Sequence, residues 1–180
     1  VVGSDHVPWF ERLLRSRVAG TLALHSPCPV VVVPEDRSRD GAESAVVLTL
    51  DPESPLRSAL LFAFRQADER GCVLQVLHAT EPATLSGRAD ELHERVVAVL
   101  SEWIRAYPDV RVQLDDAIGD VADAIVRASR NAELVVVGRP HANALHAVLA
   151  QPTSLKVVRR SHCPVAVVPD VEDPREPLGG

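Results

Sequence analysis

The sequence of 180 residues predicts an α/β protein built on a doubly wound, parallel sheet of five strands. Three observations lead to this fold class. Short runs of apolar, β-branched residues recur along the chain, as in strands that are buried on both faces. Segments with apolar residues three or four positions apart separate these runs, as in amphipathic helices. The connections between them are short, which is usual in folds of this class.

The first half of this pattern begins with the run AVVLTL at 45–50, which predicts a strand buried on both faces. A helix is expected to follow from Ser54 to about Arg70. Ser54 is the candidate N-cap of this helix, and Gly71 is its expected stop. The run CVLQVLHA at 72–79 predicts the second strand.

The second half repeats the alternation. A longer helix is predicted over about 86–107, and VRVQLDDA at 110–117 alternates like a strand near the edge of a sheet. The remaining predicted elements are a helix over 119–132 that is capped by Asp120, a strand at 133–137, a helix over about 142–159 and a last strand at 164–168.

An internal repeat divides the chain. A shift of 135 residues places residues 1–36 over 136–171 without a gap and gives 12 identities. These identities gather at the two ends of the window, where VVGSDH matches VVGRPH and SPCPVVVVP matches SHCPVAVVP. A shared strand–helix–strand unit produces such a pattern. Residues 1–36 are therefore predicted to be the C-terminal part of an upstream copy.

The rest of the chain follows from this division. Residues 37–44 are polar and are expected to form a linker, and residues 45–169 are expected to form a complete downstream copy. Residues 170–180 are acidic and rich in proline and glycine, so a disordered tail is expected there. The sequence contains no methionine and opens inside an apolar run, which suggests a piece of a longer polypeptide.

In this order and spacing, VVLTLD, GDVADAI, ELVVVG and HCPVAVVP resemble the universal stress protein family in its tandem-domain form. The resemblance implies a sheet with the strand order 3-2-1-4-5. It also implies that two copies join through their last strands, 30–34 and 164–168, which then run antiparallel. Some members of the family bind ATP, with the motif G-x2-G-x9-G-[ST] after the fourth strand and an aspartate at the end of the first.

This chain departs from the ATP-binding motif. Gly138 matches the first glycine, but His141, Gln151 and Pro152 occupy the other three positions. A histidine ring fills space that bare backbone needs, and proline has no N–H to donate. Arg139 and a protonated His141 can replace part of the lost anion contacts, because a guanidinium binds phosphate with two hydrogen bonds.

Asp51 and Gly119 each have two interpretations. Asp51 follows the first strand, where open α/β sheets bind ligands, but it can equally bond the backbone of the next turn, DPES. Gly119 can lie near a ribose or phosphate, or it can simply serve a strand-to-helix turn that needs glycine.

Charge and cysteine content exclude several classes of function. The net charge of −6 argues against nonspecific binding to nucleic acid or to anionic membranes. No apolar run reaches the length of a membrane span. The three cysteines show no metal-binding spacing and are expected to be reduced thiols in a cytoplasmic protein.

The sequence therefore favours a non-catalytic, cytoplasmic stress-response or regulatory module that binds no cofactor. It would act through a protein partner and through self-association of strands 30–34 and 164–168. The first alternative is an adenine-nucleotide sensor that binds ATP through Asp51, Gly119 and the altered loop (Gly138, Arg139, His141). A weak ATP hydrolase ranks last, because the chain shows no P-loop lysine and no identifiable base.

Overall fold

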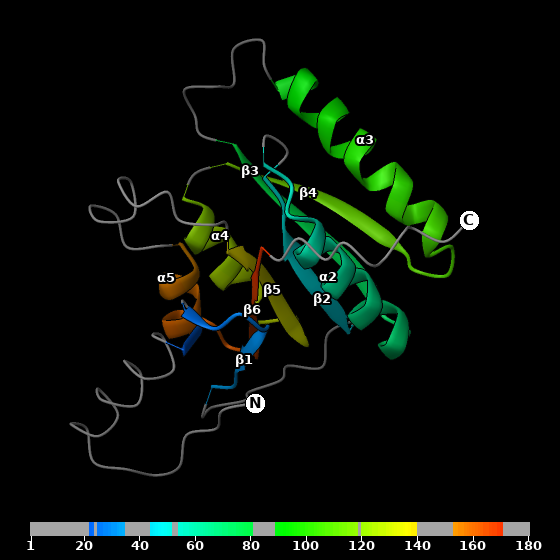
Figure 1. The fold of residues 1–180 in the computed structure, drawn as a ribbon. Coiled ribbons are helices and arrows are strands. Elements are labelled where there is room, and N and C mark those ends of the chain that lie inside the picture. Colours follow the sequence, from blue (N-terminus) through cyan, green and yellow to red (C-terminus); the bar gives the residue numbers. More distant parts are fainter. Residues whose placement is uncertain are drawn as a thin grey trace, which may run out of the picture.

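A computed structural model describes residues 22, 23, 25–34, 44–51, 54–80, 89–118, 120–139 and 153–170. Figure 1 shows strands gathered in one twisted sheet with helices on both of its faces. The expected α/β fold with a mostly parallel sheet is thus confirmed. In chain order the elements are β1 (Val30–Val32), β2 (Ala45–Thr49), α2 (Arg57–Arg70), β3 (Val73–Thr80), α3 (Ala89–Ala106), β4 (Val112–Ile118), α4 (Val121–Ala128), β5 (Leu134–Arg139), α5 (Thr153–Arg160) and β6 (Val165–Pro169).

The described sheet has six strands in the order β1-β6-β5-β2-β3-β4. Strand β2 lies at the centre, parallel to β5 on one side and to β3 on the other. Strands β6 and β4 continue the parallel arrangement outward. At one edge β1 pairs antiparallel with β6, and Val31 faces Ala166 in this ladder.

Alternate side chains of the strands feed two apolar clusters, one on each face of the sheet. Helices α2 and α3 cover the first face, where Phe64 stacks on Trp103 with ring centroids 5.8 Å apart. Helices α4 and α5 cover the second face with Ile125 and Val157, which are fully buried. Ala23, from the short segment before β1, is buried in the second cluster.

The prediction that Ser54 caps α2 is wrong. The helix begins at Arg57 and its N-cap is Leu56, whose side chain makes no capping bond. The backbone N–H of Ser54 instead donates to the carbonyl of Asp51 at 3.2 Å, so this residue closes a turn before the helix. The predicted stop at Gly71 is confirmed, because this glycine adopts the left-handed conformation (φ 59°) as the C-cap.

Strand β5 extends two residues beyond the predicted 133–137. Gly138 and Arg139 belong to the strand and lie opposite Val168 and Pro169 of β6. The backbone N–H of Asp170 extends this pairing by donating to the carbonyl of Arg139 at 3.0 Å. Gly138 therefore does not begin the expected turn.

Other boundaries also differ from the sequence-based expectation. Helix α4 ends at Ala128, short of the predicted 132, because Ser129 becomes its C-cap. Helix α5 begins at Thr153, and residues 142–152 of the predicted helix lie outside the described residues. The same is true of residues 1–21, of the linker apart from Ser44, and of the tail after Asp170.

Candidate nucleotide site

The carboxyl ends of β2 and β5 lie side by side at the centre of the sheet. The two strands are parallel, and Leu48 faces Val136 in their ladder. Continuing this register by three residues brings Asp51 level with Arg139. This is the edge at which open parallel sheets bind ligands. Gly138 and Arg139 end β5 and Asp51 follows β2, so the three predicted site residues belong to the same edge of the sheet.

Gly138 is needed for packing within the strand. Its φ is not positive, because Gly71 is the residue described with a positive φ. A Cβ built on Gly138 would lie 2.5 Å from Cδ1 of Leu56, the residue that starts α2. The absence of a side chain therefore lets the start of α2 approach β5. Glycine at this position therefore serves close packing and does not provide the positive φ of a phosphate-binding turn.

The guanidinium of Arg139 is engaged with another part of the chain. Its Nη2 donates a hydrogen bond of 2.6 Å to the carbonyl oxygen of Ser26, and the contact is partly buried. Ser26 follows a short helical segment, since its own N–H donates to the carbonyl of Leu22 at 2.8 Å. Arg139 thus bonds the C-terminal end of that segment, a position that favours a cation.

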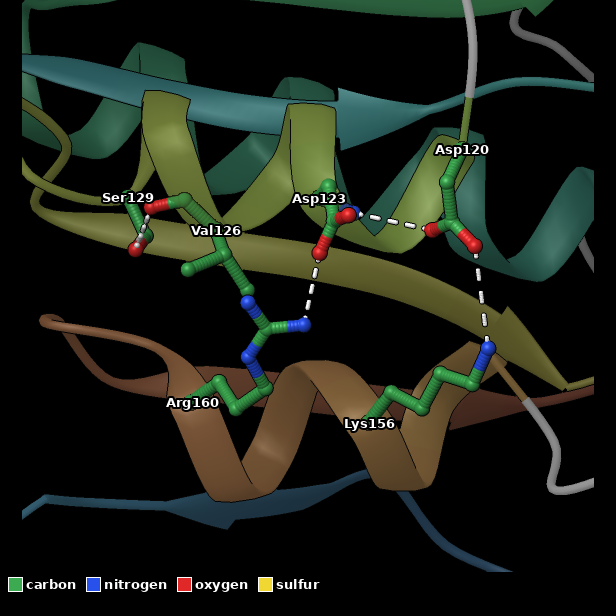
Figure 2. A network of polar contacts seen from close by, with 6 residues as sticks. All are labelled: Asp120, Asp123, Val126, Ser129, Lys156 and Arg160. Carbon is green, nitrogen blue, oxygen red and sulfur yellow. Dashed lines mark hydrogen bonds and ion pairs between the residues drawn. The ribbon is translucent and has the colours of Figure 1, made fainter.

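The N-terminus of α4, a second potential anion site, is occupied by a carboxylate of the chain itself (Figure 2). The predicted cap Asp120 is confirmed, because its Oδ1 accepts a bond of 3.0 Å from the backbone N–H of Asp123. Its other oxygen lies 3.6 Å from Nζ of Lys156 on α5. The bond from Asp123 N–H, followed by the charge of Lys156, lowers the pKa of Asp120. A phosphate here would have to displace this carboxylate.

The α4–α5 pair is tied together at two further points. Nη1 of Arg160, on α5, lies 2.6 Å from Oδ1 of Asp123. The buried hydroxyl of Ser129 donates to the carbonyl of Val126 at 2.8 Å and accepts from the backbone N–H of His162 at 3.0 Å. These contacts link α4 to α5 and to the turn before β6.

Two interpretations remain for Asp51. Its side chain is exposed at the strand end, as a ligand-binding residue requires. Its backbone carbonyl closes the turn to Ser54, which is the structural role in a form that uses the main chain. Gly119 and His141 lie outside the described residues, so their roles stay predictions.

One buried polar residue near this edge was missed in the sequence. His78 of β3 is 6% exposed, and its Nδ1 lies 3.3 Å from the carbonyl oxygen of Leu50. The carbonyl can only accept, so Nδ1 carries the proton of this contact. Its Nε2 is buried and has no hydrogen-bond partner among the described residues. The signal was available: His78 lies two and four residues after Val76 and Leu74, so it shares the face of β3 that they turn to the core.

The site offers one cation and no cluster suited to metal or redox chemistry. Within the described ranges, no three His, Cys, Asp or Glu side chains gather as metal ligands. All three cysteines lie in the described part of the chain and none forms a disulfide with another; Cys28 is exposed and Cys163 buried, before opposite ends of the β1–β6 pair. Burial, and secondarily the charge of Glu133, raises the pKa of Cys72. Nor does any described helix combine the length and apolarity needed to cross a membrane.

Comparison with known proteins places this geometry among its relatives. A sequence model described as the universal stress protein family matches residues 44–169. Among curated proteins, Rv2623 of Mycobacterium tuberculosis is 30% identical over 173 residues, covering 88% of this chain and 57% of its own length. Rv1996 of the same organism is 28% identical over 178 residues, covering 91% of this chain and 56% of its own. Both are named universal stress proteins, and this chain spans little more than half of their length.

Solved structures agree on the fold. A universal stress protein of Archaeoglobus fulgidus superimposes with a TM-score of 0.68 at 24% identity, covering 96% of this chain and 60% of that one. A universal stress protein in complex with cAMP superimposes with a TM-score of 0.53 at 24% identity, covering 73% and 100%. A further Archaeoglobus fulgidus structure, in complex with dAMP, has a TM-score of 0.55 at 17% identity, covering 69% and 97%. Since the family model spans most of the sequence and the sheet has the fold of these structures, the chain belongs to the universal stress protein family.

Proposed function

We propose that this chain is a non-catalytic regulatory module of the cytoplasm that acts through protein contacts and not through a triphosphate-binding loop. The observation that carries the proposal is the bond between Arg139 and the carbonyl of Ser26. The residue best suited to replace the missing loop glycines is used to hold another segment of the chain.

Two neighbouring features support this proposal. Leu56 packs where a Cβ of Gly138 would lie, so the one retained glycine of the motif has a packing role. Asp120 fills the N-terminus of α4 with negative charge, which repels a phosphate group. The loop sequence adds His141 in place of a glycine and Pro152 in place of a hydroxyl residue.

Adenine-nucleotide binding is the second candidate, and a specific observation favours it. Two proteins of the same fold have been solved in complex with cAMP and with dAMP. In this chain Asp51 and Arg139 follow the last β2–β5 pair at the carboxyl edge of the sheet, where open parallel sheets bind ligands. A nucleotide monophosphate would need fewer phosphate contacts than ATP, so the altered loop is less of an obstacle to it.

We further propose that residues 1–36 and 136–171 are equivalent parts of two tandem copies related by a local twofold axis. The shift of 135 residues that aligns the repeat carries Val31 onto Ala166, and these residues face each other in the β1–β6 ladder. The same shift carries Val32 onto Val167, which faces Val30. Such reciprocal pairing is the mark of an isologous contact. In self-association, β1 of one chain would pair in the same way with β6 of the other.

Calorimetric titration with Mg-ATP and, separately, with AMP tests the functional proposal. No heat of binding to Mg-ATP is expected at protein concentrations of tens of micromolar. Arg139→Gln should leave this result unchanged, with Arg127→Gln on the exposed face of α4 as the charge-matched control. Micromolar binding of Mg-ATP that is lost in Asp51→Asn would sink the proposal. Binding of AMP alone would support the second candidate.

A substitution in β1 tests the twofold contact. Val31→Asp should destabilise the chain, because Val31 packs on the first apolar cluster beside Ala166. Val97→Asp is the matched control, since Val97 is 46% exposed on α3. Equal unfolding midpoints for the two variants in urea would contradict the proposed packing of the two copies.

A further inference from the structure

The Arg139–Ser26 bond joins the candidate site to the segment that precedes the complete domain. We propose that this bond fastens residues 22–34 to the sheet and that a phosphate-class anion at the end of β5 releases the segment by taking the guanidinium. The anion and the segment would then compete for one side chain. This goes beyond the proposed function, because it needs only a phosphate group and no nucleotide.

The segment depends on few contacts. Strand β1 has three residues, and each of them is only half-buried at the edge of the sheet. Apart from this ladder, Ala23 is the side chain of the segment that is buried in the core. Elements with few buried contacts open locally at low cost, so loss of one partly buried bond should be felt here first.

An anion at high concentration can compete with the Ser26 carbonyl for Arg139. A guanidinium binds phosphate through two parallel, charge-assisted hydrogen bonds, whereas the Ser26 carbonyl receives a single bond from Nη2. Among the described residues no carboxylate forms an ion pair with Arg139, so its charge is not neutralised by them. Its place at the carboxyl end of β5 is where a ligand would arrive.

The internal repeat does not reproduce the Arg139–Ser26 bond in the upstream copy. The position equivalent to Arg139 in the upstream copy is Ser4, and the equivalent of Ser26 is Ser161. A serine cannot supply the cation, so the reciprocal bond across the local twofold axis has no counterpart in the sequence. The downstream copy alone would then sense the anion and report it to the upstream segment.

Hydrogen exchange followed by mass spectrometry on the full chain tests the competition. The chain is compared in potassium chloride, in potassium phosphate and in AMP, all at equal ionic strength. In the wild type, phosphate should raise the exchange rate of peptides that cover residues 22–34 and leave those of β2 unchanged. Arg139→Gln should raise that rate on the order of tenfold already in chloride, as expected for a lost bond from a charged donor. The variant should then show no response to phosphate.

Arg127→Gln is the control, since it removes one exposed positive charge from α4 and should behave as the wild type. Exchange in residues 22–34 that is the same in Arg139→Gln and wild type would overturn the proposal. So would a wild-type segment that does not respond to phosphate, or a response that survives in Arg139→Gln. A response to AMP at lower concentration than to phosphate would support the competition and identify a nucleotide as the source. Micromolar binding of Mg-ATP would refute the proposed function without deciding this test.

Discussion

Replacing Gly138 with alanine tests whether this glycine serves packing or phosphate binding. The new Cβ would lie 2.5 Å from Cδ1 of Leu56 and 3.4 Å from its Cβ and Cγ. The Leu56 side chain has to leave this position, so the cost of overpacking should fall near the middle of the usual ~1–3 kcal/mol. Alanine also lowers the entropy of the unfolded chain, which offsets about 0.4–1 kcal/mol. The expected net loss is therefore about 1 kcal/mol.

Thermal unfolding can resolve a loss of this size. The domain of residues 44–169 should unfold with an entropy of about 2.1 cal/mol/K per residue, so about 1 kcal/mol corresponds to roughly 4 °C in Tm. A double-mutant cycle that combines Gly138→Ala with Leu56→Ala isolates the contact between the new methyl group and the leucine. The double variant should be about 2 kcal/mol more stable than the sum of the single losses predicts, because the whole clash disappears with the leucine.

Gly71 supplies the matched control for this cycle. An alanine there would meet no atom within 4 Å, but it would have to adopt a φ of 59°. Gly71→Ala should therefore destabilise the chain through its backbone, and Leu56→Ala should not rescue it. A Gly138→Ala variant as stable as the wild type, or a cycle without coupling, would refute the packing role of this glycine.

Three further predictions concern other residues. The pKa of Asp120 is lowered in the folded chain, so its contribution to stability is present above pH ~4 and is lost as the pH falls below that value. Asp120→Asn should keep the cap and lose this acid dependence, whereas Asp120→Ala should lower Tm at neutral pH; acid titrations of unfolding decide. Exposed Cys28 should react with iodoacetamide before Cys72, whose pKa is raised by burial, and peptide mass spectrometry would expose the reverse order. Ser129→Ala should cost about 1–3 kcal/mol in urea unfolding, because its buried hydroxyl serves two backbone groups; exposed Ser101→Ala, the control, should cost nothing.

The sequence predicted the elements that depend on local pattern. Continuous valine runs predicted buried parallel strands. Gly71 predicted the end of one helix, and Asp120 predicted the start of another. The predictions failed where contacts with residues far away in the sequence determine the local structure. Pairing with Val168 and Pro169 keeps Gly138 and Arg139 in β5, although a glycine after three valines suggests a turn.

The sequence could predict where the candidate site lies but not which contacts its residues make. Strand ends and parallel pairing suffice to bring Asp51 near Arg139. No sequence pattern could indicate that Arg139 bonds Ser26, because the acceptor is a main-chain carbonyl 113 residues away. Every residue carries such a carbonyl, so its use depends on the tertiary fold alone.

The β1–β6 ladder also sets an order of events during synthesis. Val31 leaves the ribosome 135 residues before its partner Ala166. At translation rates of about 5–20 residues per second, this strand waits roughly 7–27 s for its partner. During that interval its valines have no partner strand and need another cover. Because β6 is the last described strand to be synthesised, the β1–β6 ladder can form only after all the other described strands have been made.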